Sequence, residues 1–71
     1  MIEFDLNGRR LVLEETVVRK LQADALAGAG SSTTLNDLSL ILSRALSDRK
    51  VITLQRAESR ALEQLLNPNN P

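Results

Sequence analysis

The dipeptide Asn7-Gly8 is the feature that most constrains how this chain folds. Asn-Gly favours a two-residue type I′ turn, because both central positions of that turn need a positive φ. Apolar and acidic residues alternate before it, from Ile2 to Leu6, and a period of two places alternate side chains on one face of a strand. The sequence therefore predicts a β-hairpin over residues 2–14, with Phe4 opposite Leu11.

The register of this hairpin also assigns its outer face. Asp5 lies opposite Arg10, and we expect an ion pair between them. Val12 is then the one apolar residue of the second strand that points away from the core.

Helical spacing of apolar residues follows the hairpin. The first predicted helix begins at Glu14-Glu15 and runs to about Ala27. The stretch Gly28–Thr33 interrupts the pattern, and we expect one of its glycines to cap this helix in the left-handed conformation. Thr34 is the expected N-cap of a second helix that ends near Arg49, with Asp37 completing a loose capping box and Ile41 on the apolar side of the helix.

The last part of the chain predicts a short strand and a third helix. Lys50–Leu54 is rich in β-branched residues, and helical spacing returns from Arg56 to Asn67, before Pro68. Glu58 falls where it can cap the start of this helix. The predicted strand either pairs with the hairpin within the chain or leaves the hairpin edge open to another chain.

These elements predict one small α+β domain over residues 1–67: an N-terminal β-hairpin, two helices, a short strand and a C-terminal helix. Residues 68–71 are expected to form a disordered tail.

Composition excludes several kinds of site. The chain has 71 residues with no Cys and no His, so it can form no disulfide and has no thiolate or imidazole metal ligand. A nucleophile beside a base is not recognisable, and so small a chain leaves little room for a substrate pocket. We therefore expect no enzymatic activity, no cofactor, no metal site and no small-molecule substrate.

The net charge and the hydropathy pattern of the chain argue against nucleic acid and membranes as partners. Nine basic and nine acidic residues give a net charge of zero, which favours neither nucleic acid nor an anionic membrane surface. No uninterrupted apolar run exceeds three residues, far short of the roughly 20 that span a bilayer. The expected location is the cytoplasm, without membrane attachment.

One resemblance points to nucleic acid. The segment from Val51 to Glu58 is similar, over eight residues, to the strand-then-helix start of some winged-helix regulatory domains. It implies, as an alternative function, a small DNA-binding transcriptional regulator. The cations that would contact phosphates are Arg44, Arg49, Lys50, Arg56 and Arg60. Solvated helix faces are the simpler explanation of these residues.

Protein association is the function that the sequence favours. On a helical wheel Leu40 lies opposite the apolar side of the second helix, and Leu26 falls among charged residues of the first. With Val12, these residues are the candidate protein interface. A core this small usually needs a supplement, and oligomerisation is the one left to this composition. We therefore expect a noncatalytic interaction module that binds itself and another protein, as an adaptor, assembly factor or regulator.

Overall fold

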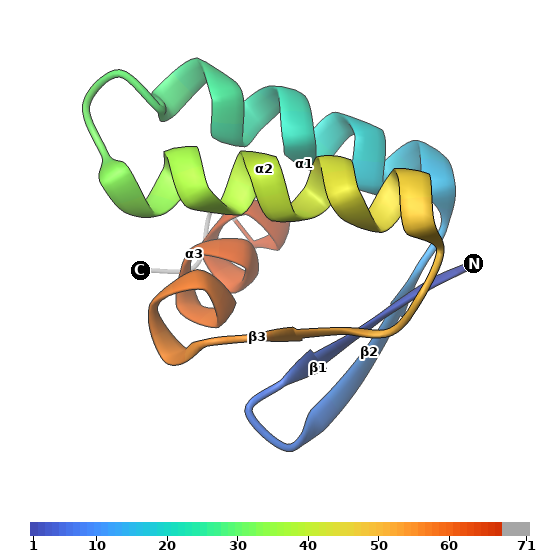
Figure 1. Cartoon of the computed structure of the whole chain (residues 1–71). Helices are drawn as coiled ribbons and strands as arrows, with labels where there is room; N and C mark the ends of the chain where they lie inside the picture. Colours follow the sequence, from blue (N-terminus) through green and yellow to red (C-terminus); the bar gives the residue numbers. More distant parts are fainter. Residues whose placement is uncertain (68–71) are drawn as a thin grey trace.

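The computed structural model describes residues 1–67 as one small α+β domain (Figure 1). Along the chain its elements are β1 (Ile2–Leu6), β2 (Arg9–Leu13), α1 (Glu15–Gly28), α2 (Thr33–Asp48), β3 (Ile52–Leu54) and α3 (Arg56–Leu66). The predicted fold class and order of elements are confirmed. The tail expected over residues 68–71 lies outside the described residues.

The hairpin has the predicted turn and register. Asn7 and Gly8 both have positive φ angles, 55° and 96°, and Phe4 is the partner of Leu11. The expected Asp5–Arg10 ion pair is wrong, although the two residues face each other across the strands. The Asp5 carboxylate instead accepts a hydrogen bond from the Gly8 backbone N–H at 3.0 Å, and Arg10 pairs with its diagonal neighbour Glu3 at 3.5 Å.

The third strand pairs with the hairpin inside the chain. β3 runs parallel to β1, with Phe4 beside Ile52 and Leu6 beside Leu54, and the sheet order is β2-β1-β3. The free edge of β1 is thus covered in cis, and β3 becomes an edge strand. β3 begins at Ile52, two residues later than predicted, because the chain first leaves α2 through Arg49, which has a φ of 55°.

The helix ends differ from prediction at the linker between α1 and α2. Ser32, and not Thr34, is the N-cap of α2, and its Oγ accepts the Leu35 N–H at 3.2 Å. No linker glycine is left-handed: α1 ends at Gly28, and its C-cap residue Ala29 has a φ of −65°. Gly28 instead lies against the end of the Leu35 side chain, where a Cβ would stand 2.5 Å from Cδ1 and the leucine would have to shift.

The other helix ends are set by two different devices. At the end of α2, Arg49 is the C-cap and has the left-handed conformation. The sequence had predicted a left-handed cap at the end of α1, formed by a glycine. Glu58 caps α3 as predicted, because its Oε1 accepts the Gln55 backbone N–H at 3.1 Å.

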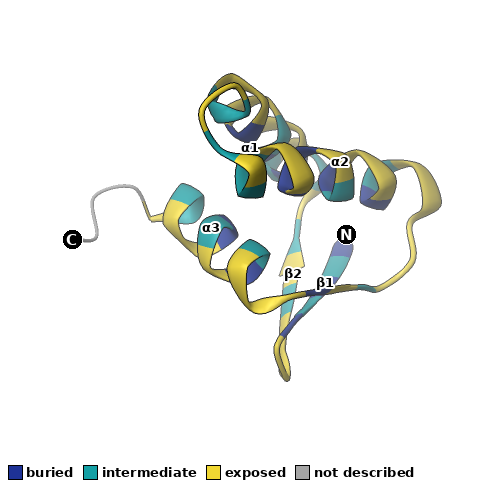
Figure 2. Ribbon diagram, turned by 60° about the vertical axis from the view of Figure 1, so that its left-hand side comes forward, coloured by how far each residue is buried: buried dark blue, intermediate teal, exposed yellow. Residues whose placement is uncertain are grey.

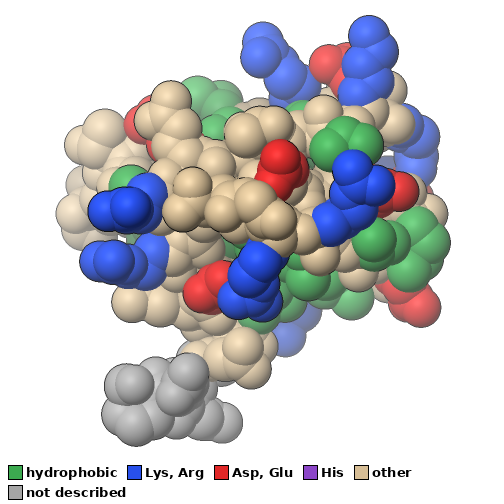
Figure 3. All heavy atoms as spheres, turned by 90° about the horizontal axis from the view of Figure 1, so that it is seen from below, with side chains coloured by type: hydrophobic (Ala, Val, Ile, Leu, Met, Phe, Trp, Pro, Cys, Tyr) green, Lys and Arg blue, Asp and Glu red, His purple; other side chains and the backbone are tan. Residues whose placement is uncertain are grey.

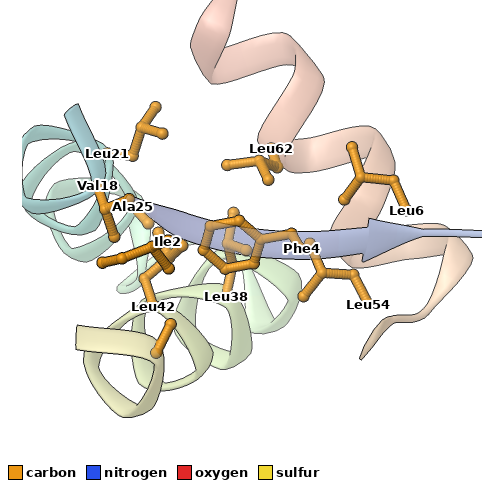
Figure 4. Packing of buried hydrophobic residues seen from close by; sticks show 11 residues of the cluster. Ile2, Phe4, Leu6, Val18, Leu21, Ala25, Leu38, Leu42, Leu54 and Leu62 are labelled. Atoms are coloured by element: carbon orange, nitrogen blue, oxygen red, sulfur yellow. The ribbon is translucent and has the colours of Figure 1, made fainter. Parts of the chain in front are cut away.

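The three helices cover one face of the sheet and leave the other face bare (Figures 1 and 2). Phe4 lies at the centre of the core with no exposed surface, between Leu38 of α2 and Leu62 of α3 (Figure 4). The buried apolar residues come from five of the six elements and are Ile2, Phe4, Leu6, Val18, Leu21, Ala25, Leu38, Leu42, Ala45, Leu54 and Leu62. β2 contributes no fully buried residue, but its Leu11 and Leu13 are half-buried against this cluster. Everything that can contact a partner therefore lies on the outer sides of the helices, on the bare sheet face or at the sheet edges.

Candidate protein-interaction surface

Leu40 is a large apolar side chain on the outer side of α2. The core side of this helix carries Leu38, Leu42 and Ala45, all fully buried, whereas Leu40 is 62% exposed. The exposure expected from the helical wheel is confirmed. Exposing this apolar side chain to water is unfavourable, and a partner that buried it would gain free energy.

An open groove of about 710 Å³ begins beside Leu40. It lies between α2, β3 and the start of α3, and it is lined by Asp37, Leu40, Ile41, Arg44, Ile52, Thr53, Gln55 and Glu58. Ile41 and Ile52 are half-buried and supply further apolar surface, while charged groups stand around them. The groove also contains residues of β3, whose outer edge has no strand partner among residues 1–67.

Four of the groove residues form one continuous stripe along α2. Asp37, Leu40, Ile41 and Arg44 occupy positions i, i+3, i+4 and i+7, which lie on one side of a helix. We call this set the α2 stripe. Sequence reasoning found Leu40 but placed Ile41 in the core and gave Asp37 a capping role. The i, i+3, i+4, i+7 spacing was the signal that links the four.

The structure does not bring the three predicted interface residues together. Leu26 is as exposed as Leu40, at 62%, but it belongs to α1 and does not line the groove. Val12 lies on the bare side of the sheet, opposite the side that the helices cover. Of the three, Leu40 borders a hollow with further apolar surface.

The bare sheet face has an apolar area of its own. Val12, the partner of Glu3, lies on this face, and the exposed Met1 and Val51 directly precede the inward-facing Ile2 and Ile52. Figure 3 looks onto this side of the molecule, where hydrophobic side chains gather among charged ones. Sequence reasoning did not name Met1 and Val51 as surface residues, although the alternation that puts Ile52 and Leu54 on one side of the predicted strand already puts Val51 on the other.

The five predicted phosphate-contacting cations are spread over the molecule. Arg44 belongs to the α2 stripe, and Arg49 and Lys50 follow the end of α2. Arg56 and Arg60 of α3 share a smaller hollow with Arg9, whose guanidinium pairs with Glu63 at 3.6 Å. The structure therefore gathers at most two of the five predicted cations at one place.

Arg49 has a structural partner. Its guanidinium donates a hydrogen bond to the Glu15 carboxylate at the start of α1, and Arg19 contacts the same carboxylate at 3.6 Å. Arg49 first, and Arg19 to a lesser extent, hold the pKa of Glu15 below its ordinary value of 4.5. This contact ties the start of α1 to the end of α2, and it occupies a cation that nucleic acid would otherwise need.

We expect the Glu15→Gln variant to lose part of the acid sensitivity of the protein. Because the pKa of Glu15 is lowered by folding, its charge stabilises the native state above pH 4.5, and this contribution disappears as the pH falls through the lower folded-state pKa. The wild-type advantage over Glu15→Gln should be small and should vanish in acid, since the contact is exposed. Urea unfolding of both proteins from pH 7 to pH 3, with Glu63→Gln as control, measures it. An advantage that grows in acid would contradict the assignment.

The helices do not form the motif that a winged-helix regulator would need. α1 and α2 run antiparallel side by side (Figure 1), whereas the helices of a helix-turn-helix cross at about 90–120°. β3 separates α2 from α3. The segment Val51–Glu58 thus has the strand-then-helix form of the resemblance, but without a preceding helix-turn-helix in residues 1–67.

Other kinds of site find no support in the described part of the chain. Residues 1–67 contain no group of three or more acidic side chains placed to hold a metal ion. None of their helices has the length and apolar character of a membrane span. No protein-family model, curated protein or solved structure shows significant similarity to this chain.

Proposed function

We propose that this chain is a noncatalytic protein-interaction module that assembles with itself. The observation that carries the proposal is Leu40, an exposed leucine at the border of a groove with two further apolar side chains, Ile41 and Ile52. Full burial of an exposed leucine is worth about 1.5–3 kcal/mol of transfer free energy, and Leu40 still has 62% of its surface to bury.

The size of the domain supports self-assembly. Residues 1–67 contain one core of eleven buried apolar residues, and the composition offers no disulfide. Domains of this length seldom gain more than about 3–5 kcal/mol from such a core alone. Association with a second copy adds stability by mass action, because only the folded chain presents the surface. An adaptor, assembly factor or regulator could then use the bare sheet face, with Met1, Val12 and Val51, for another protein.

Two substitutions with equal initial exposure test this proposal. Leu40→Asp should shift the protein to monomers, because a buried carboxylate without a partner opposes association, while its circular dichroism stays native. Leu26→Asp, on an equally exposed leucine outside the groove, should leave the assembly intact. Light scattering at micromolar concentration, with refractive-index detection because the chain has no Trp or Tyr, measures the mass.

A native protein that is monomeric at every concentration, with a melting temperature independent of dilution, would refute self-assembly. Loss of assembly in both variants would place the contact elsewhere than at Leu40.

A further inference from the structure

The α2 stripe has an order of charges that complements itself. Asp37 stands three residues before Leu40, and Arg44 stands three residues after Ile41. The stripe thus has an acid near one end, a base near the other and two apolar residues between them. Neither Asp37 nor Arg44 takes part in an ion pair among residues 1–67.

A twofold axis across the stripe would bring each charged residue opposite one of the other sign. When two copies of one helix pack antiparallel about such an axis, residues at equal distance from the axis on either side meet. An axis between Leu40 and Ile41 places Leu40 of each copy against Ile41 of the other. The same axis places Asp37 of each copy against Arg44 of the other, which makes two identical ion pairs across the contact.

The surroundings of the stripe fit a second copy. Asp37 and Arg44 are both exposed, so their side chains can reach outward, and the stripe continues into the groove above β3. β3 runs beneath α2 in the opposite direction and forms the edge of the sheet (Figure 1). The axis that pairs the two helices therefore also turns the two β3 edges toward each other in antiparallel orientation, on the side where each edge has unpaired backbone groups.

From these observations we propose that the partner at the groove is a second copy of this chain, held by a twofold α2–α2 contact with Leu40 and Ile41 at its centre and two Asp37–Arg44 pairs at its ends. This inference rests on the proposed self-assembly and adds its interface and symmetry. It assigns the groove to this chain itself, and it leaves the bare sheet face exposed on both copies.

Charge reversal separates this interface from any other. Asp37→Arg makes both charges of the stripe positive, and Arg44→Asp makes both negative. Each variant alone should dimerise at least about tenfold more weakly than the native chain, because two attractive contacts become repulsive. An equimolar mixture of the two variants should form a heterodimer with about native affinity, since each pair is then attractive again. Lys20→Asp and Asp24→Arg, exposed residues of α1, are the matched controls.

Sedimentation with interference optics, in low and high salt, measures the dissociation constants of the native chain, of the four variants and of the mixture. Rescue in the mixture of Asp37→Arg and Arg44→Asp, with no effect of the α1 variants, supports the twofold contact. If the native chain dimerises but charge reversal weakens nothing, or the mixture fails to associate, this interface is wrong while self-assembly stands. If the native chain is a monomer throughout, self-assembly itself is refuted and the groove is left to a different partner.

Discussion

Phe4→Ala should remove about 3–5 kcal/mol from the free energy of unfolding, the largest loss expected from any single apolar truncation in this chain. Phe4 has no exposed surface and lies between α2 and α3, beside β3, so its truncation leaves a cavity that no single element can close (Figure 4). Domains have roughly 0.05–0.15 kcal/mol of stability per residue, so the loss is comparable to the entire stability of 67 described residues.

Urea unfolding followed by far-ultraviolet circular dichroism measures this loss, because Phe4 is the only aromatic residue of the chain. All proteins are compared at one concentration, since self-assembly would add to the apparent stability. Phe4→Leu is the control: it keeps most of the buried volume and should cost distinctly less. Equal losses for Phe4→Leu and Phe4→Ala would show that the cavity is not the cause.

Leu62→Ala should cost about 2–5 kcal/mol, because Leu62 is the one fully buried apolar side chain that α3 adds to the core. α3 is otherwise held by half-buried residues and by the buried Ser59, whose hydroxyl donates to the Leu54 carbonyl at 3.5 Å. The same substitution at Leu65, three residues later and half-buried, should cost less than half as much.

The measurement for Leu62→Ala is the same urea titration, together with hydrogen exchange of the α3 amides. If α3 depends on Leu62, its amides exchange faster in the variant even where the hairpin is still protected. Equal costs at Leu62 and Leu65 would contradict the burial that separates them.

Local signals in the sequence predicted most of the fold. The Asn7-Gly8 turn determines the hairpin register by itself, because a two-residue turn leaves no freedom in the pairing of the strands. Helical spacing located all three helices for the same reason, since the apolar side of each is visible within one or two turns.

Helix ends were harder to predict, because several residues compete for each of them. Ser32 and Thr34 are both good N-caps, and it is the Ser32 hydroxyl that accepts the Leu35 N–H in the structure. Arg49 is the left-handed C-cap of α2, a position that glycine usually occupies. Its side chain donates a hydrogen bond to Glu15, which is far away in the sequence. Contacts of this kind are not encoded in the local pattern.

The groove beside α2 could not be predicted, because it depends on where β3 pairs. The sequence left open whether residues 50–54 complete the sheet in cis, and the pairing of Ile52 with Phe4 places β3 below α2. Leu40 alone was visible as an outward leucine. Ile41 was counted as core, and it does pack against the buried cluster, but it is only half-buried and also lines the groove.

The parallel pairing of β1 with β3 also has a consequence for how fast the chain reaches its native state. The hairpin and the α1–α2 pair join neighbours in sequence, whereas Phe4 and Ile52 are separated by most of the described chain. Closing so long a loop costs entropy before any contact is made, so local pieces form early and β3 docks late. Until β3 docks, β1 has an open edge and the Phe4 ring lacks one wall of its pocket. This is the interval in which refolding chains are most prone to aggregate.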